Sequence, residues 1–125
     1  MGAQTPDVEI PPLRVRKTNR ILRTSDFRRA YTQGKRIAGQ FFTAFCLKVP
    51  LNAGPRFGFT VPRALGKAVV RNRVKRRLRE MLRLRVAEFA PEWDIVINPR
   101  RSAFTASSDD LRREVDRLIT QCAKL

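Results

Sequence analysis

The sequence predicts a small single-domain α+β sandwich, with helices packed on one sheet in an αβββαβα-like order. The chain has 125 residues, of which 42% are hydrophobic, and this suits one domain with one small core. Segments of helix-like and strand-like periodicity follow one another as helix, strands, long helix, strand and helix. No segment repeats within the chain.

Residues 1–20 are expected to form a flexible, basic, proline-containing arm ahead of the folded domain. This segment holds Pro6, Pro11 and Pro12, mixes charges and shows no sustained periodicity. Segments of this kind bury too little apolar surface to fold alone, so the arm would need a partner to become ordered. We therefore place the folded domain at residues 21–125.

A short helix should open the domain. Phe27, Ala30 and Tyr31 form an apolar stripe at positions i, i+3 and i+4. Ser25 is a favoured N-cap residue, and Gly34 is expected to end the helix in the left-handed conformation.

Two stretches then alternate in the manner of β-strands. Residues 41–49 carry apolar side chains on both faces. After a turn, residues 56–61 place Phe57, Phe59 and Val61 on a face that we assign to the core. The other face of that strand is expected to be a surface and carries Arg56, Gly58 and Thr60.

Pro62 and Gly66 turn the chain into a long basic helix, which should run to about Phe89 and end before Pro91. Six of the ten residues 71–80 are Lys or Arg. At about 100° per residue, the apolar residues fall within one arc: Val70, Val74, Leu78, Met81, Leu82 and Phe89. The opposite side, which should be offered to phosphates, carries Asn72, Lys75, Arg76, Arg79 and Arg83.

A buried-type strand over residues 94–98 and a final helix complete the domain. Ser107 and Asp110 stand at capping-box spacing at the start of that helix. Its buried stripe should consist of Leu111, Val115, Leu118, Ile119 and Cys122. Cys46 and Cys122 both lie on apolar faces and are expected to be buried free thiols.

The charge of the chain indicates a nucleic-acid partner. Its 27 Lys and Arg against 11 Asp and Glu give a net charge of +16, which repels itself unless a partner neutralises it. A membrane surface is the weaker alternative, because the basic helix lacks an insertion face rich in Trp and Phe. The sequence has no apolar run of about 18 residues and no signal-peptide core, so we expect a cytoplasmic protein.

The sequence offers no catalytic residue and no metal site of its own. It has no histidine, which excludes Ser-His-Asp and Cys-His arrangements and a His-Cys zinc site. Its carboxylates are scattered: Asp109 and Asp110 fit the first turn of a helix, and Glu80 and Glu88 fit ion pairs with neighbouring arginines. If the protein takes part in RNA cleavage, its partner should supply the catalytic groups.

Residues 57–80 resemble the signature of the bacterial ribonuclease P protein subunit. The segment contains, unbroken, Arg71-Asn72-Arg73 followed by Lys75 and Arg76. The helix that ends at Gly34, the aromatic strand around Phe45 and the strand starting at Asp94 also occur in the expected order. The resemblance therefore covers the chain from about residue 20 to its C-terminus.

The resemblance implies a function, partners and a cofactor. In that family the protein pairs with a catalytic RNA, and the ribonucleoprotein removes the 5′ leader of precursor tRNA by hydrolysing one phosphodiester bond. Mg²⁺ is held by the RNA, and no membrane or DNA partner is expected. The family fold also contains a left-handed crossover, in which the basic helix links two parallel strands, whereas the general rule favours a right-handed one.

Residue by residue, the resemblance implies two RNA-binding surfaces. The catalytic RNA would contact Arg71, Asn72, Arg73, Lys75, Arg76 and Arg79. The single-stranded leader would enter a cleft lined by Phe27, Tyr31, Phe45 and Thr60. A single strand also needs cations along its backbone, for which the candidates are Arg28, Arg56 and Arg63.

Other aromatic residues are expected in the core. This set consists of Phe42, Phe57 and Phe59, with Trp93 closing the core at the entrance of its strand. Phe27 fits a core position as well as a stacking position, whereas the Tyr31 hydroxyl favours exposure. The chain departs from the family pattern at Ala64, where many relatives carry a lysine, so Arg63 is the one cation expected at that edge of the cleft.

Two other classes of protein fit the charge. A ribosomal or RNA-chaperone-type protein shares the basic composition and the arm, but requires neither the motif nor an aromatic cleft. A DNA-binding module would read a major groove with a similar helix. Such a module usually needs a second helix before it across a short turn, and here a strand precedes.

Overall fold

The computed structural model describes residues 20–21 and 23–125, so nearly all of the predicted arm lies outside the described residues. Seven main elements follow one another: α1 (Thr24–Gln33), β1 (Lys35–Ala38), β2 (Phe42–Lys48), β3 (Arg56–Phe59), α2 (Ala68–Arg83), β4 (Trp93–Pro99) and α3 (Ser108–Ala123). Short 3-10 turns lie between them, η3 (Arg63–Leu65), η4 (Val86–Glu88) and η5 (Arg101–Phe104). The predicted α+β class and its αβββαβα order are confirmed.

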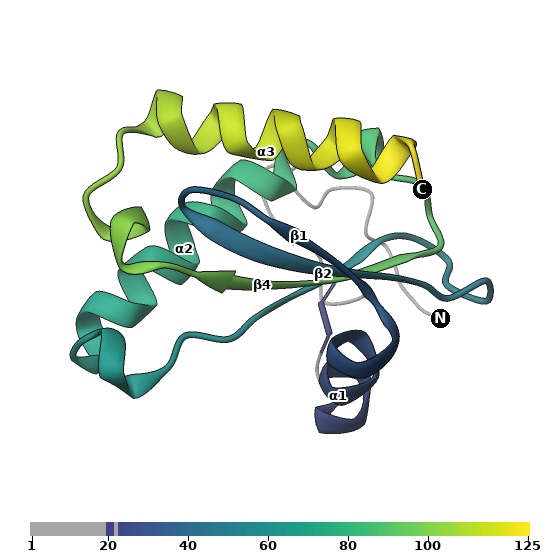
Figure 1. Cartoon of the computed structure of the whole chain (residues 1–125), viewed down its shortest axis with the longest axis horizontal. Coiled ribbons are helices and arrows are strands. Elements are labelled where there is room, and N and C mark those ends of the chain that lie inside the picture. Colours follow the sequence, from purple (N-terminus) through teal and green to yellow (C-terminus); the bar gives the residue numbers. More distant parts are fainter. Residues whose placement is uncertain (1–19, 22) are drawn as a thin grey trace, which may run out of the picture.

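The sheet has the strand order β1-β2-β4-β3. Strand β2 runs antiparallel to β1 and β4, whereas β3 runs parallel to β4. Helix α2 connects these two parallel neighbours, as the resemblance led us to expect, and the left-handed sense of this crossover stays a prediction. Helices α2 and α3 cover one face of the sheet, and α1 lies against the other (Figure 1).

The main core lies between the sheet and the pair α2 and α3. Phe42, Phe57 and Trp93 are buried in it as expected, while Phe59 is only half-buried at its edge. Cys46 of β2 and Cys122 of α3 are free thiols in this core, with 3.7 Å between their sulfur atoms. Their contact and burial raise the pKa of the Cys46 thiol.

Helix α1 differs from expectation at both ends. It starts at Thr24 after Arg23, with no side-chain cap, so Ser25 lies inside its first turn. Gly34 is extended, with φ −80°, because the chain passes directly into β1. Glycine is needed there for close approach, since an added Cβ would lie 2.5 Å from the Ala30 carbonyl oxygen.

Helix α2 is shorter than predicted, ending at Arg83 rather than near Phe89. The turn η4 replaces the last predicted helical turn, and it lets Phe89 enter the core beside Phe57, with ring centroids 5.1 Å apart. Arg85 stabilises this turn by pairing with Glu88 and with Asp116 of α3. Phe89 fits the apolar periodicity of the helix but is buried from outside it, which is why the predicted helix was too long.

Glu114 of α3 holds the turn between β1 and β2. Glu114 is 8% exposed, and its carboxylate accepts hydrogen bonds from the backbone N–H groups of Gln40, Phe41 and Phe42 at 2.8–3.0 Å. Gly39 leaves room for it, because a Cβ there would overlap a carboxylate oxygen of Glu114. One acidic side chain therefore joins the last helix to the first hairpin.

Replacing Glu114 with Gln should lower the free energy of unfolding by about 2–3 kcal/mol, because one acceptor becomes a donor facing buried N–H groups. Urea denaturation measures this loss. Asp109→Asn on the same helix is the control, since the Asp109 side chain is 73% exposed and should change stability by less than about 1 kcal/mol. Equal losses for both variants would contradict the structural role of Glu114.

Candidate nucleic-acid interface

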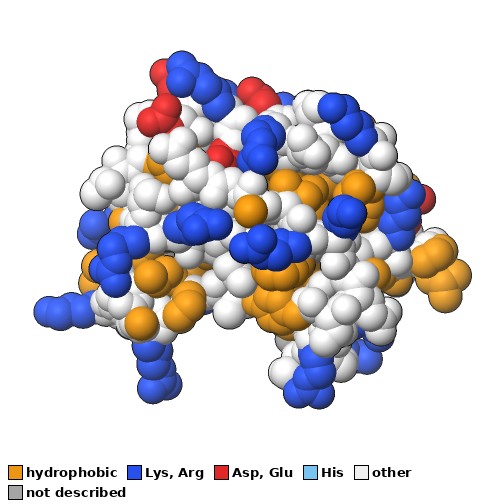
Figure 2. Space-filling model, viewed as in Figure 1, with side chains coloured by type: hydrophobic (Ala, Val, Ile, Leu, Met, Phe, Trp, Pro, Cys, Tyr) orange, Lys and Arg blue, Asp and Glu red, His pale blue; other side chains and the backbone are white. Residues whose placement is uncertain are grey.

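Helix α2 presents a cationic face from its first half. Val74, Leu78 and Leu82 are buried against the core, which confirms the predicted two-sided pattern. Asn72, Arg73 and Arg76 are exposed. In Figure 2, Lys and Arg side chains are spread over the visible face, whereas Asp and Glu gather mainly over α3.

Two cations of α2 brace the protein itself. Arg71, predicted to contact RNA, donates from Nε to the Gly66 carbonyl at 3.1 Å. Gly66 has φ +147°, a conformation that only glycine adopts readily, so this bond steadies the turn that leads into α2. Arg77 donates to the carbonyls of Ala103 and Ala106 at 3.2 and 2.6 Å and ties α2 to the segment before α3.

Arg83 does not belong to the offered row, contrary to the prediction. Its side chain is only 9% exposed and pairs with Glu80. The row therefore stops at Arg79, whose guanidinium lies over the Phe59 ring, 5.5 Å from the ring centroid. Burial, and secondly the charge of Arg20, lower the pKa of Arg79.

The aromatic residues predicted for the leader cleft gather beneath α1. Tyr31 and Phe45 meet edge to face with ring centroids 4.9 Å apart, and both are half-buried. The Phe27 ring lies against Gly58 of β3, where a Cβ would come within 2.6 Å of it. We call Phe27, Tyr31 and Phe45 the aromatic cluster.

Strand register adds a cation to this cluster that the sequence analysis missed. Arg36 of β1 stands opposite Phe45, which stands opposite Val96, and directly opposed residues share a face of a sheet. Arg36 is exposed. Its strand was not placed from the sequence, because four residues with two charges give no clear alternation.

A polar row lies beside the aromatic cluster on the same face. Thr43 and Asn98 are opposite each other, and the exposed Thr60 continues β3 at this level, with its N–H bonded to the Ile97 carbonyl. Asn98 accepts the Tyr31 hydroxyl at 2.9 Å. The alternation of residues 94–98 was the signal that could have placed Asn98 here. Figure 2 shows a hollow below the sheet, between α1 and the segment leading into α2.

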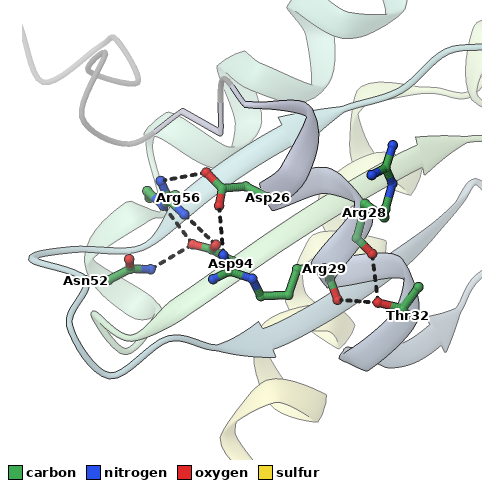
Figure 3. Close-up of polar contacts among 7 residues, drawn as sticks. All are labelled: Asp26, Arg28, Arg29, Thr32, Asn52, Arg56 and Asp94. Atoms are coloured by element: carbon green, nitrogen blue, oxygen red, sulfur yellow. Dashed lines mark hydrogen bonds and ion pairs between the residues drawn. The ribbon is translucent and has the colours of Figure 1, made fainter.

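Arg56, a predicted leader-binding cation, is engaged within the protein. Its Nε and Nη2 donate to the buried Asp94 carboxylate at 2.8 and 2.6 Å, and Asp26 of α1 lies 3.5 Å away (Figure 3). The hydrogen bond to Asp94 raises the pKa of Arg56. Asn52 also donates to Asp94. Arg56 therefore fixes α1 on the sheet rather than facing the hollow.

The other two predicted cations are exposed. Arg28 points away from the Arg56 network (Figure 3), and Arg63 lies in η3 just after the polar row. Arg101 donates to the Ala64 carbonyl at 3.2 Å. Turn η5 therefore places a cation beside Ala64, the position at which the sequence analysis noted a missing lysine.

The described part of the chain, residues 20–21 and 23–125, has no group of three His, Cys, Asp or Glu side chains placed to hold a metal ion. Within the same residues, no helix has the length and apolar character needed to cross a bilayer.

Comparison with known proteins gives one consistent family. The family model described as Ribonuclease P matches residues 15–123. The ribonuclease P protein component of Acidothermus cellulolyticus is 38% identical over 101 residues, covering 80% of this chain and 84% of that protein. That of Symbiobacterium thermophilum is 35% identical over 111 residues, covering 89% and 96%.

Solved structures agree with the sequence matches. The RNase P protein of Staphylococcus aureus aligns with a TM-score of 0.73 at 26% identity, covering 85% of this chain and 95% of that one. The RNase P protein of Thermotoga maritima aligns with a TM-score of 0.72 at 28% identity, covering 80% and 94%.

Replacing Gly58 with Ala should lower the free energy of unfolding by about 1–3 kcal/mol, because the new methyl group displaces the Phe27 ring. The loss should be smaller in a Phe27→Leu background, where a more flexible side chain can yield. Urea denaturation of the four proteins in this cycle measures the coupling. The same loss in both backgrounds would show that Phe27 does not pack on β3 as described.

Proposed function

This chain belongs to the ribonuclease P protein family, and we propose that it is the protein subunit of a ribonucleoprotein that removes the 5′ leader of precursor tRNA. The observation that carries this proposal is the presence of two surfaces with different chemistry on one small domain. One is a row of cations on α2, and the other is an aromatic and polar face beside α1.

The α2 surface would bind the catalytic RNA. Its residues for this role are Arg71, Asn72, Arg73, Lys75, Arg76 and Arg79. Exposed Arg73 and Arg76 suit direct contact with phosphates, which is largely electrostatic and independent of sequence. Arg71 would act mainly by holding the Gly66 turn, and so the direction of the helix.

The face beside α1 would receive the single-stranded leader. Its residues are Phe27, Tyr31, Phe45 and Thr60, with Arg28 and Arg63 along the backbone of the strand. A base stacked on an aromatic ring contributes about 1–3 kcal/mol, and a single strand has unpaired bases to stack. Asn98 and Arg36 extend this set with a hydrogen-bonding amide and a cation. Arg56 would support the site indirectly by holding α1 in place.

Hydrolysis itself would be the work of the RNA. The protein would hold the leader and orient it relative to the RNA partner, while Mg²⁺ bound by the RNA supplies the metal chemistry. No side chain of the protein is assigned a catalytic role. A cytoplasmic location, which suits this substrate, stays a prediction.

The isolated protein should not cleave precursor tRNA, whereas adding the catalytic RNA of the same organism should give cleavage at the 5′ end of the mature tRNA. Gel analysis of end-labelled precursor at low Mg²⁺ measures this. The RNA alone is the control, and the protein should lower the Mg²⁺ concentration that it needs. Correctly placed cleavage by protein free of RNA would contradict the proposal.

Separate substitutions should affect the two surfaces differently. Arg73→Ala with Arg76→Ala should weaken binding to the catalytic RNA for every substrate alike, because phosphate contacts are lost. Tyr31→Ala with Phe45→Ala should spare assembly but reduce the preference for precursor over mature tRNA, by about 2–6 kcal/mol if both rings stack fully on bases. Binding titrations with both tRNA forms measure these effects.

A matched control removes two cations from α3, where Arg112 and Arg113 are exposed. Their replacement with Ala should leave both binding reactions nearly unchanged. Thermal melting of each variant separates a binding defect from a folding defect. If the folded variant without the Tyr31 and Phe45 rings still prefers precursor over mature tRNA as strongly as the parent protein, these rings have a purely structural role.

A further inference from the structure

A small pocket lies at the free edge of the sheet, between the two proposed RNA surfaces. Strand β3 is an edge strand, and Arg20 forms an isolated parallel bridge with Phe57 beyond it. The pocket has a volume of about 170 Å³ and is lined partly by Phe27 and Gly58, on the α1 side, and by Phe59, on the α2 side. It therefore reaches from one face of the sheet to the other.

Three cations line this pocket without a compensating carboxylate. They are Arg20, Lys75 and Arg79, and none of them makes an ion pair with a residue in the described part of the chain. The buried Nε of Arg79 also has no hydrogen-bond partner among those residues. Half-buried Arg56 and Arg85, by contrast, are paired with carboxylates.

The pocket also holds Arg79 ready for a ligand. Its guanidinium lies over the Phe59 ring, a contact that orients the planar group through its face and uses none of its N–H donors. Such a fork matches two oxygen atoms of one phosphate. Pockets for drug-sized molecules usually measure about 300–1,000 Å³, so this one suits a single anionic group better than a metabolite.

We propose that this pocket binds one phosphodiester group of RNA, with Arg79 as the principal ligand and Arg20 and Lys75 completing the cation set. The bound strand would be anchored where it passes from the α1 face to the α2 face. This inference rests on the proposed function, because it takes RNA as the source of the phosphate. The phosphate could belong to a single-stranded segment or to the structured catalytic RNA.

Binding measurements with two RNAs test the pocket. Fluorescence anisotropy gives dissociation constants of the full chain for a labelled single-stranded RNA oligonucleotide and for the catalytic RNA. Arg79→Gln and Arg20→Gln should each weaken binding of one or both RNAs roughly tenfold, the loss of one charge-assisted hydrogen bond. Arg117→Gln, an exposed residue of α3, should change neither.

The double variant identifies a shared phosphate. If Arg20 and Arg79 hold the same group, their combined loss should differ from the product of the single losses by about threefold or more, whereas independent contacts multiply. A weakening confined to the oligonucleotide assigns the phosphate to a single strand, and one confined to the catalytic RNA assigns it there. No weakening of either RNA, or simple multiplication, overturns the proposal.

Two further measurements keep the outcomes distinct. Arg20 is exposed and pairs with β3 through its backbone, so Arg20→Gln reports on the pocket even if Arg79→Gln disturbs folding. Arg79→Lys retains the charge but not the planar fork, and it should recover only part of the affinity. Cleavage by the wild-type protein with its catalytic RNA is measured in parallel, because failure there would count against the proposed function rather than the pocket.

Discussion

The bidentate pair between Arg56 and Asp94 determines where α1 lies, and much of the proposed leader site depends on it. Asp94 stands at the start of the central strand β4 and is almost fully buried. Through Arg56 it reaches Asp26 in the first turn of α1 (Figure 3). The helix is thereby held on the sheet, where its Tyr31 hydroxyl reaches Asn98 of β4.

The few carboxylates of this basic chain mainly stabilise the protein's own structure. Asp94 and Glu114 are buried and serve the internal frame, one beneath α1 and the other at the first hairpin. Exposed acidic residues of α3, such as Asp109, pair with cations on their own helix. The first half of α2 contains no Asp or Glu, so its positive charge stays available to an external polyanion.

Features set by local pattern could be predicted from the sequence, and features set by distant contacts could not. The buried stripes of α2 and α3 follow from helical periodicity, and the Ser107 cap follows from capping-box spacing. Arg56 looked like a free surface cation, because its partner Asp94 is 38 residues away. Arg83 obeyed the helical pattern, yet tertiary packing buried it. The aromatic residues predicted for the leader cleft did gather in space, but Arg56 did not join them, and Arg36 and Asn98 emerged only from strand register.

The position of β4 also has a consequence for how the chain folds. This strand lies between β2 and β3, although both precede it in the sequence, and α2 separates it from β3. Closing the parallel pair spans the long interval between Arg56 and Asp94, which costs loop-closure entropy before any contact compensates for it. During synthesis, β4 is the last strand to be made, and β3 cannot join the sheet before it. Before β4 is made, only β1 and β2 can pair, so α2 lacks the complete sheet that it packs against in the folded protein.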